Sequence, residues 1–326
     1  GRRQQGHLDC GGQSMTMLSS VAERLYWMGR YLERAEDSAR LVAAYNHLIM
    51  DIPRAAELGW DVLIRILDAE PLFYQQYRVG NEQNVLRFLL AEQDSSASIP
   101  FAVRWARENV RTTRDVLPEE TWEQINELHL YVSDAAEKSV GRRNRQAFLE
   151  EVISRCQRVN GMLSSSLPRD HAHRFLRLGH LLERSDMTTR LMDVGTGEIL
   201  KRDGTHEAID PLIWTSLLQA LSSFGAYRRM IGPLVEAQQV LEFVFQEPLL
   251  PRSVAFCLAE IRAELKPLNN HEKVMRTLAR GRRKLGKLQP EHMSREALHA
   301  YIDEFQALLA DLHDVITASW FQPDTP

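Results

Sequence analysis

Two stretches of the chain decide the fold: GRYLERAEDSARL at residues 29–41 and GHLLERSDMTTRL at residues 179–191. The second repeats the first at an offset of 150 residues, with six of the thirteen positions identical. Both stretches have the apolar spacing of a helix. Self-similarity within a chain is the signature of an architecture built from related units. We therefore expect two copies of one long helix.

A second pair of segments repeats in the same order. Residues 85–103 match residues 240–258 at an offset of 155, with six identities in nineteen positions, and Trp60 corresponds to Trp214. These matches predict two related halves, residues 17–165 and 166–326, that pack together as one domain. Residues 1–16 show no periodicity, and we interpret them as a cloning remnant.

Helical periodicity continues over most of the remaining chain. Breaks are expected at prolines and glycines, among them Pro71 and the pair Gly195 and Gly197. No alternating stretch of useful length predicts a strand. The fold class is therefore all-α, a pseudo-symmetric helical bundle built from two related halves.

Composition excludes several classes of protein. The chain has 326 residues and a net charge of −4, which does not fit a protein that binds nucleic acid through overall basic charge. No apolar run is long enough to span a bilayer, so no membrane association is expected. The three cysteines have no paired spacing, so neither a disulfide framework nor a thiolate zinc site is predicted. A cytoplasmic location is the expectation.

The repeated helix carries a polar stripe. With about 100° between successive residues, Gly29, Glu33, Glu36 and Arg40 lie close to one line. The second copy places equivalent residues on the same line, and two basic pairs flank the stripe. The second line comprises Gly179, Glu183, Asp186 and Arg190, and the flanking pairs are Arg30 with His180 and Arg34 with Arg184.

Two interpretations of this stripe stay open. In the structural one, Glu36–Arg40 and Asp186–Arg190 are ion pairs four residues apart that fix the register between the halves. In the functional one, residues from both halves converge on a site. Glu33 and Glu183 are then the candidate catalytic carboxylates, and the other charged stripe and flanking residues bind a ligand.

The rest of the sequence offers few further candidates for catalytic, metal-binding or ligand-binding residues. Glu33 and Glu183 are followed three residues later by acidic residues rather than histidine, so we predict no metal site and no cofactor. No phosphate-binding loop is present. We expect Tyr227 and Arg228 of the AYRR element near the stripe, and Ser98 and Ser253 as helix N-caps. The seven basic residues within 273–287 are interpreted as a solvated helix face, with an anionic partner as the alternative.

The segments LYWMGRYLERAEDSARL (25–41), FLRLGHLLERSDMTTRLMDV (175–194) and LLPRSV (249–254), together with the AYRR element, resemble the bacterial alpha-E family. That family is named for an all-helical domain with a repeated Glu-Arg motif. The resemblance extends from Met17 to the C-terminus. It makes Glu33–Arg34 and Glu183–Arg184 the namesake pairs, while His180 stands where the family often has an arginine.

The resemblance implies a function that the residues alone do not. Members of the family are similar to partners of circularly permuted ATP-grasp proteins and occur with transglutaminase-like proteases. The expectation is an accessory or co-catalytic component of an ATP-grasp-dependent system that forms peptide or amide bonds, with ATP-Mg held by the partner. The stripe would bind an amino acid, a peptide or an acyl donor. The alternative is a non-catalytic helical scaffold in which the stripe is an ion-pair ladder.

Overall fold

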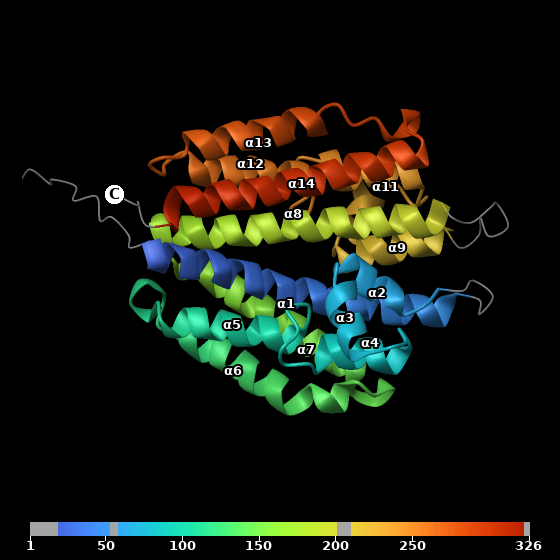
Figure 1. Cartoon of the computed structure of the whole chain (residues 1–326), viewed down its shortest axis with the longest axis horizontal. Helices are drawn as coiled ribbons and strands as arrows, with labels where there is room; N and C mark the ends of the chain where they lie inside the picture. Colours follow the sequence, from blue (N-terminus) through green and yellow to red (C-terminus); the bar gives the residue numbers. More distant parts are fainter. Residues whose placement is uncertain (1–18, 53–57, 201–209, 323–326) are drawn as a thin grey trace, which may run out of the picture.

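The structure is a computed structural model that describes residues 19–52, 58–200 and 210–322. Within these ranges every regular element is helical and no strand occurs, which confirms the all-α prediction (Figure 1). The interpretation of residues 1–16 as a cloning remnant concerns residues outside the described ranges.

The elements before residue 167 begin with one long helix, followed by shorter ones. They are α1 Ser19–Asp51, α2 Asp61–Ile66, α3 Glu70–Gln76, α4 Glu82–Leu90, α5 Ile99–Arg111, η2 Arg114–Val116, α6 Glu120–Ala135, η3 Glu137–Ser139 and α7 Arg142–Ser166.

The elements after residue 170 also begin with a long helix. They are α8 His171–Leu200, α9 Asp210–Ala220, α10 Phe224–Met230, α11 Ala237–Gln246, α12 Val254–Leu265, α13 Glu272–Leu285, η4 Pro290–His292 and α14 Arg295–Trp320.

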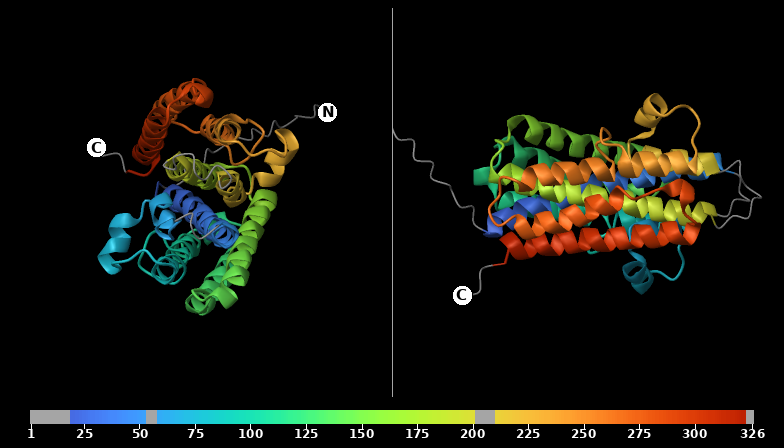
Figure 2. Two further views of the ribbon diagram at one scale, coloured as in Figure 1. Left: turned by 90° about the vertical axis from the view of Figure 1, so that its right-hand side faces the viewer. Right: turned by 90° about the horizontal axis from the view of Figure 1, so that it is seen from above.

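The two long helices α1 and α8 lie side by side at the centre of the molecule. They run in the same direction, since Gly29 of α1 faces the stretch from Leu176 to His180 of α8, and Glu33 lies further along α1 opposite Arg184. Helices α5 and α7 pack on α1, and α6 packs on both of them; helices α12 and α14 pack on α8, and α13 packs on both of them (Figures 1 and 2). Both long helices are therefore surrounded by other helices rather than lying on the surface.

Shorter helices cross between the two groups. Helix α9 packs on α1, and α2 packs on α8, so each long helix is contacted by a helix that follows the other. The hydrophobic core is continuous across these contacts. The division at residues 165 and 166 into two halves stays a prediction.

Two expected breaks differ from the structure. Helix α8 continues through Gly195 and Gly197 to Leu200. A side chain at Gly195 would meet Leu217 of α9, so this glycine gives room for packing rather than ending the helix. Pro71 lies in the first turn of α3, where a missing N–H costs no helical hydrogen bond.

The structure also locates the N-cap serines, two cysteines and the basic residues of α13. Ser98 and Ser253 each accept a hydrogen bond from a backbone N–H three residues later, which confirms both as N-caps. Cys156 and Cys257 are buried and free. Most of the basic side chains of α13 are exposed while its apolar side chains are buried, as for a solvated face. No helix in the described part of the chain has the length and hydropathy to cross a membrane.

Candidate functional site

Two glycines bring α1 and α8 into close contact. A Cβ atom built on Gly29 would collide with the backbone carbonyl oxygen of Leu176, and one on Gly179 with that of Tyr26. The same two atoms would lie 3.0 Å from the backbone nitrogen of His180 and 3.2 Å from that of Arg30. Since only glycine lacks a Cβ, each helix approaches the other through its own glycine. The charged stripes begin one turn beyond this contact.

The carboxylate of Glu33 is fully buried and is bound by three basic groups. Arg184 donates from Nε to Oε1 at 2.6 Å and from Nη2 to Oε2 at 3.0 Å. His180 lies with Nε2 2.6 Å from Oε2, and Arg252 donates from Nη1 to Oε1 at 3.1 Å. All three partners come from the second half of the sequence.

Glu183 has the reciprocal arrangement. Arg34 donates from Nε to Oε1 at 2.5 Å and from Nη2 to Oε2 at 3.1 Å, and Arg30 donates from Nε to Oε2 at 2.6 Å. Each glutamate of the repeated Glu-Arg pairs is thus bound by the arginine of the other pair. We call this set of bonds the reciprocal clasp: Glu33 with Arg184, and Glu183 with Arg34.

The ion pairs expected within each stripe are present. Arg40 donates to Oε1 of Glu36 from Nε at 3.0 Å and from Nη2 at 2.8 Å. Arg190 donates from Nε to Oδ2 of Asp186 at 2.8 Å. The structural interpretation of the stripe is therefore supported at both copies. The stripe differs from a ladder on a solvated face in being largely buried.

Arg252 and Asp37 also belong to this cluster and were not predicted from the sequence. Arg252 stands directly before the N-cap Ser253, and its guanidinium reaches three carboxylates of α1. Besides Glu33, Nη1 donates to Oδ1 of Asp37 at 2.5 Å and Nη2 donates to Oε1 of Glu36 at 3.2 Å. The signal was the quoted LLPRSV segment, in which an arginine is fixed beside a helix start.

Electrostatics separate three of the buried acids, Glu33, Glu183 and Asp37. Burial alone would raise the pKa of Glu33, but Arg184, His180 and Arg252 outweigh it and hold that pKa well below its usual range. Burial opposes Arg34 and Arg30 in the same way at Glu183, whose pKa is lowered to about 2. Burial dominates at Asp37 and, with the nearby Glu33 and Glu36, raises its pKa to about 7. Glu33 and Glu183 are therefore ionised at neutral pH.

Each side of the clasp borders a polar cavity. A cavity of about 650 Å³ between α7, α8 and α12 is lined by His180 and Arg184 of the Glu33 side. Its other ionisable lining residues are Arg169, His173, Arg174, Arg177, Glu260 and Glu264. A cavity of about 190 Å³ beside α8 is lined by Arg34, Glu183, Asp186 and Arg190. The functional interpretation of the stripe therefore has space for a ligand on both sides.

Tyr227 and Arg228 do not join these clusters. The hydroxyl of Tyr227 donates to the carbonyl oxygen of Leu234 at 3.0 Å and lies 3.1 Å from Gln239, and its ring packs edge-on against Phe243. Arg228 is exposed and lies over the ring of Phe224. These contacts join α10 to the segment that leads into α11 and involve no residue of the stripe, so the expectation that Tyr227 and Arg228 lie near the stripe stays a prediction.

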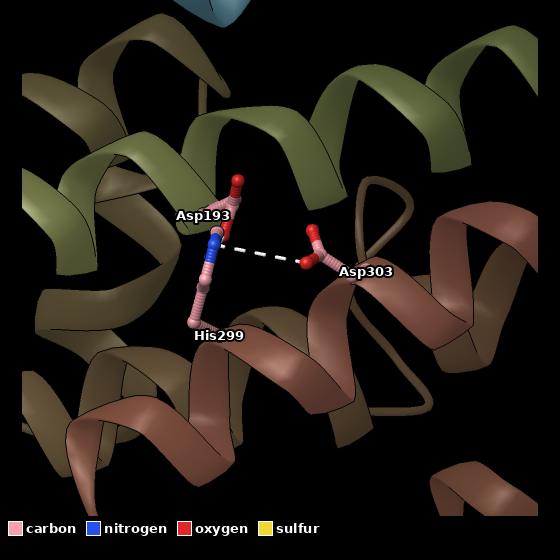
Figure 3. Close-up of side chains that lie close together, drawn as sticks. All are labelled: Asp193, His299 and Asp303. Atoms are coloured by element: carbon pink, nitrogen blue, oxygen red, sulfur yellow. Dashed lines mark hydrogen bonds and ion pairs between the residues drawn. The ribbon is translucent and has the colours of Figure 1, made fainter.

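One group of potential metal ligands occurs among the described residues. Asp193 of α8 faces His299 and Asp303 of α14, with one ligand atom from each within 4.8 Å of the others (Figure 3). Nδ1 of His299 lies 2.5 Å from Oδ1 of Asp193, and its Nε2 lies 3.6 Å from Asp303. Because His299 and Asp303 are exposed and the histidine joins both acids, we interpret the group as a link between α8 and α14. The absence of a metal stays a prediction.

The helical fold with its doubled Glu-Arg clusters defines a family. The chain belongs to the Alpha-E family, described as a predicted alpha-helical domain with a conserved ER motif, whose model matches residues 17–321.

Its curated relatives include uncharacterized proteins of Mycobacterium bovis and of Mycobacterium tuberculosis, each 22% identical over 327 residues. The match covers 92% of this chain but 36% of each relative, so the chain spans about a third of their length. No solved structure matches the chain.

Proposed function

We propose that this chain is an accessory, ligand-binding component of an ATP-dependent system that forms amide bonds. A circularly permuted ATP-grasp protein would be its partner and would carry ATP-Mg, with a transglutaminase-like protease as a further partner; both rest on the family resemblance. The ligand would be an amino acid, a peptide or an acyl donor. One observation supports the binding role most directly: each side of the clasp borders a polar cavity. A cytoplasmic location is part of the proposal.

The proposal includes descent of the chain from two related halves, 17–165 and 166–326. Matching local details support it. Asp68 and Ser222, 154 residues apart, both have a left-handed backbone, with φ of 52° and 54°. The hydroxyls of Ser98 and Ser253 donate to the carbonyl oxygens of Glu92 and Glu247, each six residues earlier. A pseudo-symmetric origin accounts for these pairs together with the reciprocal clasp.

The acids of the clasp are assigned a positioning role rather than proton transfer. Carboxylates with low pKa values are weak proton acceptors at neutral pH, so they do not suit general base catalysis. Glu33 instead fixes Arg184 and His180, and Glu183 fixes Arg30 and Arg34. Arginines held in this way present their remaining donors to a carboxylate or phosphate ligand. Of the predicted binding residues, Arg34, His180, Arg184, Asp186 and Arg190 line the cavities.

Reconstitution tests the proposal. The chain would be combined with a circularly permuted ATP-grasp protein from the same organism, and ATP turnover and product would be measured with amino acids present. Turnover that needs both chains supports the proposal, and equal turnover by the ATP-grasp protein alone contradicts it. Substitutions at Arg184 and Arg190 are tested in the same reconstitution. Arg280→Gln, on the solvated face of α13, is their matched control.

A non-catalytic scaffold is the second candidate, and one observation favours it. The clasp arginines and glutamates bind each other, and these ion pairs are sufficient for a purely structural link between α1 and α8. A scaffold would bring the ATP-grasp protein to its site of action without altering its chemistry. Product formation by the isolated ATP-grasp protein at full rate, with complex formation intact, would select the scaffold.

A further inference from the structure

The two sides of the clasp differ at the residue that precedes the N-cap serine. Arg252 directly precedes the N-cap Ser253, and its guanidinium binds Glu33, Glu36 and Asp37. On the other side, Ala97 directly precedes the N-cap Ser98. The two positions are 155 residues apart and correspond in the repeat. A methyl group therefore stands where the other half inserts an arginine.

The space left by this difference is the cavity of about 190 Å³. Its lining includes Ala97, Glu183, Asp186 and Met187, which correspond in the repeat to Arg252, Glu33, Glu36 and Asp37. The equivalent space on the other side is occupied by the Arg252 side chain. The volume is below that of a typical drug-sized ligand site and suits a small molecule.

The lining offers both unused donors and unused acceptors. Three carboxylates, of Glu183, Asp186 and Asp68, face the guanidiniums of Arg34 and Arg190, a net charge of −1 on the lining. Arg30 lies behind Glu183 and does not line the cavity. Within the described residues, Oδ1 of Asp186 and Nη2 of Arg190 make no hydrogen bond.

We infer that this cavity binds a free α-amino acid. Its ammonium group takes the place that the Arg252 guanidinium takes in the other half, against Asp186 and Glu183. Its carboxylate accepts hydrogen bonds from the unused donors of Arg190 and Arg34. The inference rests on the proposed function and deepens it, because it assigns the amino-acid substrate to the Glu183 side of the clasp.

The test is calorimetric titration of the full chain with each of the twenty free L-amino acids. At least one is expected to bind with a stoichiometry of one. Its N-acetyl derivative, which lacks the ammonium, and its amide, which lacks the carboxylate, are each expected to bind at least tenfold more weakly. Failure of all twenty to bind, or equal binding of the N-acetyl derivative, would overturn the inference.

Ala97→Arg places the missing arginine in the cavity and is expected to abolish binding. Ala310→Arg, which adds the same side chain on the exposed face of α14, is the control and is expected to bind as the unmodified chain does. Asp186→Asn provides an independent variant, with an expected loss of at least tenfold in affinity. Undiminished binding by folded Ala97→Arg, or by Asp186→Asn where Ala97→Arg does not fold, contradicts the assignment to this cavity.

The same variants separate this inference from the proposed function. Amino-acid binding that Ala97→Arg abolishes, without any product in the reconstituted system, upholds the binding site and refutes the ligase role. Product formation by the reconstituted system with an unmodified chain that binds no amino acid refutes the site and upholds the role.

Discussion

At the scale of single residues, the glutamates of the Glu-Arg pairs are buried charges that several basic side chains hold in place. Glu33 is fully buried and Glu183 almost so, and each is bound by arginines from the other half of the sequence. A buried charge that loses its partners bears its full desolvation cost. The consequences of substitution at these residues therefore concern folding first and ligand binding second.

Substitution of Glu33 should destabilise the protein strongly. Glu33→Gln leaves Arg184 and Arg252 buried with less compensating charge, and we expect a loss of about 3–5 kcal/mol in the free energy of unfolding. Urea denaturation followed by circular dichroism measures it. Glu304→Gln, at an exposed pair with Lys284, is the control and should change little. Equal stability of the two variants would refute the clasp.

Acidification should lower the free energy of unfolding through protonation of Glu183. Its pKa is about 2 in the folded chain and near 4.5 when unfolded, so the native state binds fewer protons. Its contribution, roughly 3 kcal/mol, is complete above pH 4.5 and is lost as the pH falls toward 2. Stability measured across this window should fall less steeply in Glu183→Gln than in the unmodified chain. An unchanged slope would contradict the assignment.

Asp37 should give the opposite pH dependence of stability. Its pKa is about 7 when folded and near 3.8 when unfolded, so the native state binds more protons. Stability from this group is complete below pH 3.8 and is lost as the pH rises through 7. Asp37→Asn should remove that loss, and thermal unfolding at a series of pH values would show it. A variant whose profile matches the unmodified chain between these values would count against the raised pKa.

At the scale of elements, the α1–α8 contact depends on two glycines. Gly29→Ala and Gly179→Ala would each place a methyl group against backbone atoms of the other helix, which cannot move aside as a side chain can. Overpacking of this kind costs typically about 1–3 kcal/mol.

Gly161→Ala in α7 is the matched control, since nothing lies within 4 Å of its added Cβ. It should stabilise the helix by about 0.5–1 kcal/mol, because alanine is the better helix former. The melting temperatures of the three variants test the expected losses of stability and the expected gain. A gain in stability for Gly29→Ala would show that the helices do not approach as described.

Most helices could be predicted from the sequence because their signals are local. Apolar spacing, the caps at Ser98 and Ser253 and the repeat itself all lie within short windows. Gly195 could not be assigned correctly, because the reason that it sits inside α8 is Leu217, a residue of the next helix. Propensity is a weak guide wherever packing from another element decides the outcome.

At the scale of the whole molecule, the sequence indicated the charged residues and the ion pairs within each stripe, but not the ion pairs between α1 and α8. The repeat identified Glu33, Arg34, Glu183 and Arg184, yet their crossing between halves depends on the parallel contact of α1 with α8. Arg252 enters the cluster from more than two hundred residues away, and no spacing rule connects it with Asp37. The contacts of Tyr227 could not be predicted for the same reason, since residue chemistry alone does not locate an element.

The measurement that tests the reciprocal clasp most directly is a double-mutant cycle on Glu183 and Arg34. The unfolding free energies of Glu183→Gln, Arg34→Met and the double variant would be compared with that of the unmodified chain. A second cycle on the exposed pair Arg280 and Asp311, 3.5 Å apart, gives the reference for a surface pair.

The clasp predicts a coupling energy at Glu183–Arg34 toward the upper end of about 0.5–3 kcal/mol, and clearly above that of the surface pair. Coupling no larger than that of Arg280 and Asp311 would contradict the account.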